Sequence, residues 1–179
     1  RISPTEAAHV RAELGDSVRL ILDGGRCPVG IESTIVDLSR GAGEVPRVLR
    51  PGAITPEQIA TVIGRLPEVG CQPRSATAEV VPRVPGALAA HYAPMTPMRL
   101  LPATKIARLA GTPAAGRSCA VLCHSQMLAG AAALLVRRLP ADPSHYAHEL
   151  YAALRQLDHS GADLILVEDV PSTAAWSAI

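Results

Sequence analysis

Two adjacent hydroxyl residues, Ser33 and Thr34, lie in the otherwise apolar segment Gly30–Val36. Successive side chains of a strand point to opposite faces, so one hydroxyl can face a cleft while the other faces packing. A hydroxyl donates a hydrogen bond to a carboxylate or phosphate without adding charge, which makes Ser33 a candidate substrate contact and Thr34 a weaker one. The alternative is structural, because β-branched Thr favours strands and Ser33 would lie near a strand edge.

A second candidate is Arg50, which is followed by Pro51 and Gly52. The proline fixes one backbone angle and the glycine has no side chain, so this Arg is held by a stiff local backbone. A guanidinium held in this way is suited to binding an anion. The alternative is a surface Arg before an ordinary turn.

Ser3 opens the segment Ser3-Pro4-Thr5-Glu6, which is typical of a helix start with Ser as the N-cap and Pro at the first helical position. A helix N-terminus also attracts anions, so Ser3 is a candidate phosphate contact as well as a cap.

The stretch Pro85–Pro97 has no helical or strand periodicity, and its prolines prevent either element from running through it. It still carries apolar residues and the pair His91-Tyr92, which indicates a connector that packs against something. Tyr92 can cover a nucleotide with its ring and donate one hydrogen bond. His91 is the weaker candidate: it is either a general base or a packing residue, and nothing nearby in the sequence fixes its tautomer.

His145 and His148 lie three residues apart beside Glu149, at the start of an expected helix. This is not the His-Glu-x-x-His spacing of a zinc site. A partly exposed polar face explains the pattern better, and we predict no metal site there.

Composition limits the classes of function. The 179 residues are 48% apolar but only 2% aromatic, so the core is expected to be aliphatic. A net charge of +1 gives no long-range field for gripping duplex nucleic acid, and all basic residues except Lys105 are Arg, which suits point recognition of phosphate or carboxylate. Four widely spread cysteines (Cys27, Cys71, Cys119, Cys123) argue against a disulfide framework and favour a reducing, cytoplasmic location.

The first part of the chain is expected to position Ser3, Ser33 and Arg50. The elements predicted there are a helix from Ser3 to about Leu14, a buried strand Val18–Leu22, a strand Gly30–Leu38, its hairpin partner Pro46–Leu49, and a helix opened by the capping box Thr55-Pro56-Glu57-Gln58. From about Gly70 to Val84 the pattern dissolves into the connector.

Beyond the connector, strands and helices alternate. The predicted elements are strand Met98–Leu101, helix Thr104–Ala110, strand Cys119–Cys123, strand Leu134–Arg137, a long helix opened by Asp142-Pro143, strand Asp163–Glu168, and a helix from Ser172. Such alternation is typical of an α/β fold with a small, parallel, Rossmann-like sheet. No Gly-x-Gly-x-x-Gly follows any of these strands, so the fold alone predicts no dinucleotide site.

With these residues in view, the chain resembles the two-domain form of the L-threonylcarbamoyladenylate synthases. The matching motifs are Ser3-Pro4-Thr5, Leu22-Asp23-Gly24-Gly25, Gly30–Val36, Leu49-Arg50-Pro51-Gly52, and Pro85-Gly86 with His91-Tyr92-Ala93-Pro94. Residues Tyr146 to Glu168 and Trp176 resemble the C-terminal domain of that family. The resemblance implies the C-terminal portion of a YrdC-like α/β catalytic domain (1–70), a connector covering the active cleft (71–97), and a Rossmann-like C-terminal domain (98–179).

The resemblance also implies an activity. The parent enzyme is expected to be a nucleotidyltransferase that converts L-threonine, bicarbonate and ATP into threonylcarbamoyl-AMP and pyrophosphate, for modification of adenosine 37 in tRNA. By the same resemblance Ser33 contacts L-threonine, while Ser3, Arg50 and Tyr92 contact ATP, with Mg²⁺ carried on the substrate phosphates and no protein ligand assigned to it. The product is expected to pass to the tRNA threonylcarbamoyl-transfer machinery, without a membrane and without strong direct nucleic-acid binding by this chain.

One departure concerns the extent of the chain. The Lys-x-Arg and Ser-x-Asn motifs of the family lie upstream of its Ser-Pro-Thr segment, so we expect an excerpt of a longer protein that is inactive alone and exposes strand edges and apolar surface. Two other classes of function stay open: an RNA-binding module, which the near-neutral charge and scarce aromatics disfavour, and a regulatory nucleotide-binding module without chemistry.

Overall fold

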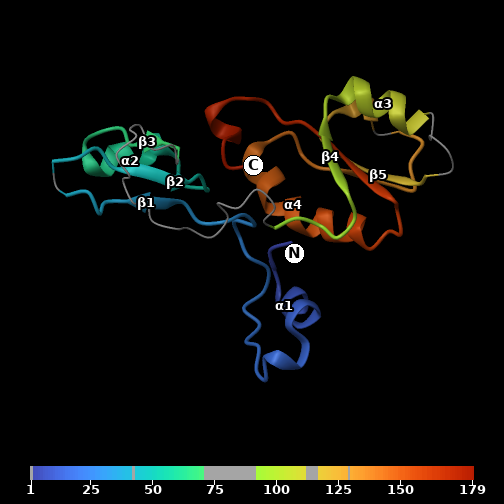
Figure 1. Cartoon of the computed structure of the whole chain (residues 1–179), viewed down its shortest axis with the longest axis horizontal. Helices are drawn as coiled ribbons and strands as arrows, with labels where there is room; N and C mark the ends of the chain where they lie inside the picture. The colour runs from blue at the N-terminus through green and yellow to red at the C-terminus, as the bar shows by residue number, and fades with distance from the viewer. Residues whose placement is uncertain (1, 42, 71–91, 112–116, 129) are drawn as a thin grey trace, which may run out of the picture. The chain divides into compact units, whose positions relative to one another are not determined.

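The computed structural model describes residues 2–41, 43–70, 92–111, 117–128 and 130–179 (Figure 1). The chain divides into two compact units. The larger unit combines Arg1–Gly30 with Tyr92–Pro171, and the smaller combines Ile31–His91 with Ser172–Ile179. The division into domains 1–70, 71–97 and 98–179 stays a prediction.

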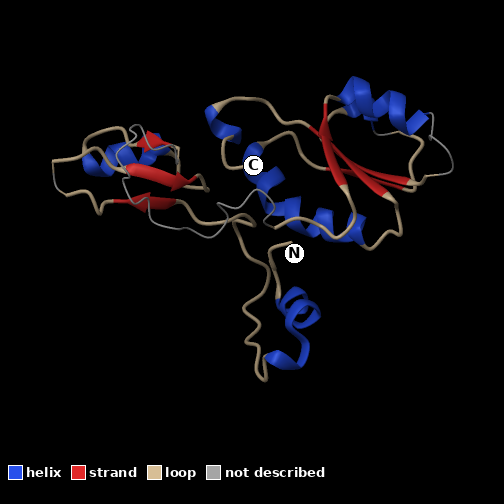
Figure 2. Ribbon diagram, in the orientation of Figure 1, coloured by secondary structure: helices blue, strands red, loops and turns tan. Residues whose placement is uncertain are grey.

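A parallel sheet forms the centre of the larger unit (Figure 2). Its strands are β4 (Met98–Leu101), β5 (Cys119–Cys123), β6 (Leu135–Arg138) and β7 (Leu164–Glu168), in the order β4-β7-β5-β6. Each neighbouring pair runs parallel. The expected α/β architecture with a parallel sheet is confirmed, and the strands lie within one residue of their predicted positions. The two central strands, β5 and β7, are short, mainly apolar runs, the pattern of a buried parallel strand.

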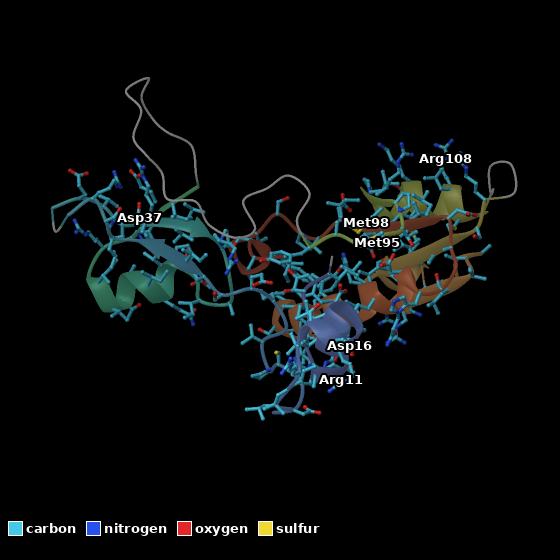
Figure 3. All side chains as sticks on the ribbon, turned by 60° about the horizontal axis from the view of Figure 1, so that its bottom comes forward. Arg11, Asp16, Asp37, Met95, Met98 and Arg108 are labelled. Atoms are coloured by element: carbon cyan, nitrogen blue, oxygen red, sulfur yellow. The ribbon has the colours of Figure 1, made fainter. Side chains whose placement is uncertain are left out.

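Two helices pack on this sheet. Helix α3 (Ala103–Gly111) buries Ile106 in a cluster with Val121 and Leu166. Side chains alternate along a strand, so Leu122 and Ile165, which are also fully buried, face the side opposite to that cluster. The outer face of α3 is solvated, and Arg108 projects from it into solvent (Figure 3).

Helix α4 (Pro143–Asp158) is the longest helix of the described residues. It begins where the sequence predicts: the Asp142 carboxylate caps it by accepting the His145 backbone N–H at 2.9 Å, and Pro143 takes the first turn. Its inner stripe includes Ala147, Leu154 and Leu157, all buried.

The N-terminal helix differs from its prediction. Helix α1 spans Ala7–Leu14, its N-cap is Glu6, and the described residues give that cap no side-chain hydrogen bond. Ser3 is therefore not a cap, and the helix begins three residues later than expected. Its end is confirmed, because Gly15 follows with a φ of 50°, a positive value that favours glycine.

The predicted buried strand Val18–Leu22 is wrong. The residues from Val18 to Leu22 form no strand within the described part of the chain, and Leu20 and Leu22 are 74% and 85% exposed. An apolar run makes a strand only when another strand pairs with its backbone. The described residues supply no such partner here.

The smaller unit carries a second, shorter sheet. Strands β1 (Ile35–Asp37) and β2 (Arg47–Arg50) form the expected antiparallel hairpin, and β3 (Glu68–Val69), which the sequence analysis missed, pairs parallel to β2. The strand predicted over Gly30–Leu38 is thus limited to its last part. Helix α2 (Pro56–Ile63) follows, with both hydrogen bonds of the predicted capping box between Thr55 and Gln58 present.

The remaining predictions on the elements and the cysteines have mixed outcomes. The helix expected from Ser172 is a single 3₁₀ turn, Ala174–Trp176. Cys119 and Cys123 lie on β5 as predicted, and both are free thiols, as is Cys27, whereas Cys71 lies outside the described residues. Among the described residues, no helix has the length and apolar character that a membrane crossing requires.

Candidate functional site

Ser33 and Arg50 meet in the smaller unit. Arg50 is the last residue of β2 and lies opposite Ile35 of β1, so the antiparallel pairing brings it back to the residues that precede Ile35. Its guanidinium donates from Nη2 to the Ser33 hydroxyl oxygen at 3.0 Å and from Nε to the Ser33 carbonyl at 3.0 Å. The structure therefore joins these two predicted residues in one fixed pair.

A carboxylate completes this arrangement. Oε2 of Glu32 lies 3.8 Å from Nη1 of Arg50, and the two side chains are only 25% and 14% exposed. The sequence analysis gave Glu32 no role, although its place directly before Ser33 was a usable signal. The carboxylate balances part of the guanidinium charge and restricts its orientation. Because the Ser33 oxygen accepts from Arg50, its own O–H is directed elsewhere and can donate to a ligand.

Gly52 explains why the motif Arg50-Pro51-Gly52 ends in glycine. A Cβ atom at this position would lie 2.3 Å from the Thr34 backbone nitrogen and 2.7 Å from both the Glu32 carbonyl oxygen and the Ser33 carbonyl carbon. These neighbours are backbone atoms, which cannot turn aside as a flexible side chain can. The turn after β2 thus lies directly against the hydroxyl-bearing segment, which only a residue without a side chain permits.

Thr34 is bound to the backbone on the same turn. Its hydroxyl donates to the Ile54 carbonyl at 2.8 Å and accepts the Ile54 N–H at 3.2 Å. Both functions of the hydroxyl are used in fixing the segment that carries Ser33 to the residues after Gly52. The geometry therefore gives Thr34 a scaffolding role.

Ser3 and Tyr92 belong to the larger unit. Ser3 lies in a segment without regular secondary structure, between Ile2 and Thr5, both of which are buried. Tyr92 is the non-glycine residue of the described chain with a positive φ, 58°, and its ring centroid is 6.4 Å from that of Tyr151 on α4. The left-handed conformation is unfavourable for a tyrosine, so its surroundings must hold it there.

Of the predicted contacts, Ser33 and Arg50 are thus brought together in one unit, while Ser3 and Tyr92 are placed in the other. His91 lies outside the described residues.

The other histidines have structural partners. His145 Nδ1 lies 2.8 Å from the Asp142 carboxylate, and His148 Nδ1 lies 3.0 Å from the Pro28 carbonyl oxygen. Over the described ranges, no three His, Cys, Asp or Glu side chains are grouped so that they could hold a metal ion.

Two family models together match almost the whole chain. Residues 54–179 match the model described as threonylcarbamoyl-AMP synthase, C-terminal domain. Residues 1–52 match a model described as telomere recombination, named for the proteins Sua5, YciO and YrdC. The boundary between the two matches falls directly after Pro51 and Gly52.

Curated relatives give the same result. A threonylcarbamoyl-AMP synthase of Bacillus subtilis is 33% identical over 99% of this chain and 51% of its own length. Proteins of the same description from Schizosaccharomyces pombe and Pyrococcus abyssi are 30% and 31% identical, over 95% and 99% of this chain. The chain spans about half the length of the curated relatives it matches.

Solved structures are similar over the same extent. The crystal structure of Pyrococcus abyssi Sua5 complexed with L-threonine superposes with a TM-score of 0.76 at 30% identity, covering 99% of this chain and 52% of that one. A structure of the same archaeal protein with an adjacent His and Tyr replaced by Ala gives a TM-score of 0.72 at 26% identity, over 99% of this chain and 49% of the other.

Proposed function

We propose a function on the premise that this chain belongs to the threonylcarbamoyl-AMP synthase family, whose C-terminal domain model matches residues 54–179. The protein that contains it forms L-threonylcarbamoyl-AMP and pyrophosphate from L-threonine, bicarbonate and ATP, as a nucleotidyltransferase. The product then serves threonylcarbamoyladenosine formation at position 37 of tRNA, through the transfer machinery that uses it.

The observation that carries this proposal is the Ser33–Arg50 pair. The turn at Gly52 packs directly against the backbone of the segment that carries Ser33. All three substrates are anionic or carry an anionic group. The pair supplies a neutral donor and a half-buried cation whose position is fixed by bonds to Ser33 and by the nearby Glu32 carboxylate. Preorganised donors of this kind stabilise developing negative charge without having to reorganise during the reaction.

Individual roles follow from the chemistry of each side chain. In our proposal the Ser33 hydroxyl donates to the threonine substrate and the Arg50 guanidinium contacts the nucleotide. Ser3 and Tyr92 of the larger unit contact ATP, and His91 is a weaker candidate. Catalysis is then mainly positioning and charge neutralisation, and Mg²⁺ carried on the phosphates would supply further neutralisation.

The test uses the full-length protein that contains this chain, incubated with L-threonine, ATP and ¹³C-bicarbonate. We expect mass spectrometry to detect threonylcarbamoyl-AMP carrying the label, with pyrophosphate released in equal amount. Arg50→Lys keeps the charge but cannot reproduce the two bonds to Ser33, so we expect activity to fall at least about tenfold, as for loss of a charge-assisted hydrogen bond. Arg65→Lys is the matched control, since Arg65 belongs to the same unit and its Nη1 donates to the Gly43 carbonyl at 3.3 Å, outside the segment that carries Ser33. Absence of labelled product from the wild-type protein would contradict the proposal.

A narrower proposal concerns these 179 residues alone. They contain neither a Lys-x-Arg nor a Ser-x-Asn sequence, the two family motifs expected to complete the site. We propose that the chain forms no threonylcarbamoyl-AMP by itself. Labelled product from the purified 179-residue chain in the same assay would overturn this statement while leaving the main proposal intact.

A further inference from the structure

Helix α4 carries three residues whose spacing places them on one side of the helix. Tyr151, Arg155 and Asp158 are four and then three positions apart, so their side chains project from the same face. We name this set the clasp face. Each of its members contacts a segment of the larger unit that is distant in sequence.

Arg155 holds the segment that carries Ser3. Its side chain is buried, with 7% of the residue exposed, although it is charged. Nη2 donates to the Ile2 carbonyl oxygen, and Nη1 donates to the Glu13 carboxylate on α1 at 2.8 Å. A buried guanidinium is tolerated only when it is paired, so these contacts fix the position of both partners relative to α4.

The other end of the same segment is fixed by α1. His9 Nδ1 accepts the Thr5 N–H at 3.2 Å and lies 3.2 Å from the Thr5 hydroxyl, and Thr5 is 3% exposed. The Thr5 carbonyl in turn accepts the Cys27 N–H at 2.8 Å. Ser3 therefore lies on a short segment that is held at Ile2 from α4 and at Thr5 from α1.

The remaining clasp-face residues hold the end of the connector. Tyr151 packs its ring against Tyr92, and Asp158 accepts the backbone N–H groups of Thr96 and Met95 at 2.7 and 3.1 Å. These contacts hold the ring of Tyr92, the residue with the unfavourable positive φ, and the backbone three and four residues after it. Contacts of this kind can keep a tyrosine in a left-handed conformation that an unrestrained chain would rarely populate.

From these contacts we infer that the clasp face of α4 positions the two nucleotide-contact segments of the larger unit, and that Arg155 is a positioning residue for ATP binding through the Ser3 segment. The inference rests on the proposed function, in which Ser3 and Tyr92 contact the nucleotide. Its physical basis is preorganisation: a binding segment that is ordered before the ligand arrives loses less conformational entropy on binding. Helix α4 thus contributes to synthase activity without touching a substrate.

The experiment measures the steady-state kinetics of full-length protein carrying Arg155→Met or Arg155→Lys. For Arg155→Met we expect the KM for ATP to rise about tenfold, because the Ser3 segment must then be ordered when ATP binds, while kcat changes less than about threefold. The KM for L-threonine should stay unchanged, because Ser33 belongs to the other unit. Arg155→Lys should bind ATP more tightly than Arg155→Met but less tightly than the wild type. Lysine keeps the charge but cannot bond to Ile2 and Glu13 through two separate guanidinium nitrogens.

Gln156→Met provides the matched control. Gln156 is the exposed neighbour of Arg155 on α4, and we expect this variant to match the wild type in both KM values. Hydrogen exchange adds a readout that requires no activity: the Thr5 amide should exchange faster in the Arg155→Met chain than in the Gln156→Met chain.

Each outcome decides one of the two proposals. The inference is supported if the Thr5 amide exchanges faster and the KM for ATP rises while the KM for L-threonine stays the same. Unchanged Thr5 exchange, or equal increases in the KM of both substrates as from general destabilisation, overturns it, as does an Arg155→Lys variant that binds ATP as weakly as Arg155→Met. If the wild-type protein makes no threonylcarbamoyl-AMP, the proposed function itself fails, which is a different result from a wild-type enzyme whose Arg155 variants keep their ATP affinity.

Discussion

The two sheets of this protein differ in how completely they are buried. In the parallel sheet of the larger unit, Val121, Leu122 and Ile165 have no exposed surface. In the smaller unit, β2 is buried at Val48, but the helix that follows, α2, has no buried residue in the described structure, and its Val62 is 86% exposed.

This difference separates a sheet that is stabilised by burial from the segment that carries the Ser33–Arg50 pair. The parallel sheet obtains its stability from aliphatic burial on two faces. The smaller unit holds its chemically interesting residues by local devices instead: a hairpin, a capping box, a close glycine contact and a guanidinium bonded to a neighbouring segment. Residues held by such local structure depend on the exact geometry of a few contacts. The stability of the sheet beneath α3 depends instead on how completely apolar side chains fill its core.

The largest expected effect concerns the stability of the buried parallel sheet. Leu166→Ala removes a side chain that is 1% exposed at the centre of the parallel sheet. We expect the free energy of unfolding of the larger unit to fall by about 3 kcal/mol, through lost burial and the cavity left behind. Hydrogen exchange of the β5 and β7 amides measures it.

The matched control is Leu100→Ala on the neighbouring strand β4, where the side chain is 64% exposed. Its effect should stay within about 0.5 kcal/mol. Equal destabilisation by both variants would show that burial does not distinguish these positions.

A smaller effect is expected for the close contact at Gly52. Gly52→Ala forces a Cβ against the backbone of Glu32, Ser33 and Thr34, so the turn and that segment must separate. We expect about 2 kcal/mol of destabilisation in the smaller unit, the usual range for overpacking. The single Trp of the chain, Trp176, belongs to this unit, and its fluorescence in chemical denaturation reports the change.

Gly43→Ala serves as the comparison for this variant. An added Cβ at Gly43 meets no atom within 4 Å, and its φ is not in the left-handed region. The two variants should therefore differ clearly in the midpoint of the Trp176 transition. Coinciding midpoints would mean that the turn can move away from the hydroxyl-bearing segment without a loss of stability.

The smallest expected effect is a dependence on pH through His9. Burial, followed by the nearby Arg155 charge and then Arg26, lowers the pKa of His9 below its usual 6.5, and the carboxylates of Glu6 and Glu13 only partly oppose this. Between the two pKa values the unfolded chain binds more protons than the folded one, so stability is fully present above pH 6.5 and is lost as the pH falls toward the folded-state pKa.

The measurement is the free energy of unfolding of the larger unit at several pH values from 7.5 down to about 5, a window that lies above the titration of ordinary carboxyls. His9→Gln should flatten the slope in this window, because glutamine does not titrate. A slope that survives the substitution would assign the effect to another group.

Much of the fold was predictable because it depends on local pattern. Strand β5 is a buried apolar run, and α4 begins with Asp142-Pro143 as capping chemistry requires. The capping box of Thr55 and Gln58 was equally visible, since all its atoms lie within four consecutive residues. The failures share a different cause. Ser3 looks like a cap, and Val18–Leu22 looks like a strand, yet the N-cap is Glu6 and the apolar run lacks a pairing strand in the described chain.

The candidate site shows the same division. Ser33 and Arg50 could be selected from their residue types and neighbours, whereas the partnership of Arg50 with Glu32 required the antiparallel register. The clasp face of α4 had no signal in the sequence, because Arg155 contacts residues more than 140 positions away.

The amino-acid sequence by itself determined the elements whose information is short-range: periodic apolar runs, caps, turns and the motifs that indicate the family. Only the tertiary structure decided which polar groups are paired and which segments are held by α4. The physical reason is that a hydrogen bond or ion pair between distant residues depends on distances of a few ångströms, and these exist only after the chain has closed the loops between them.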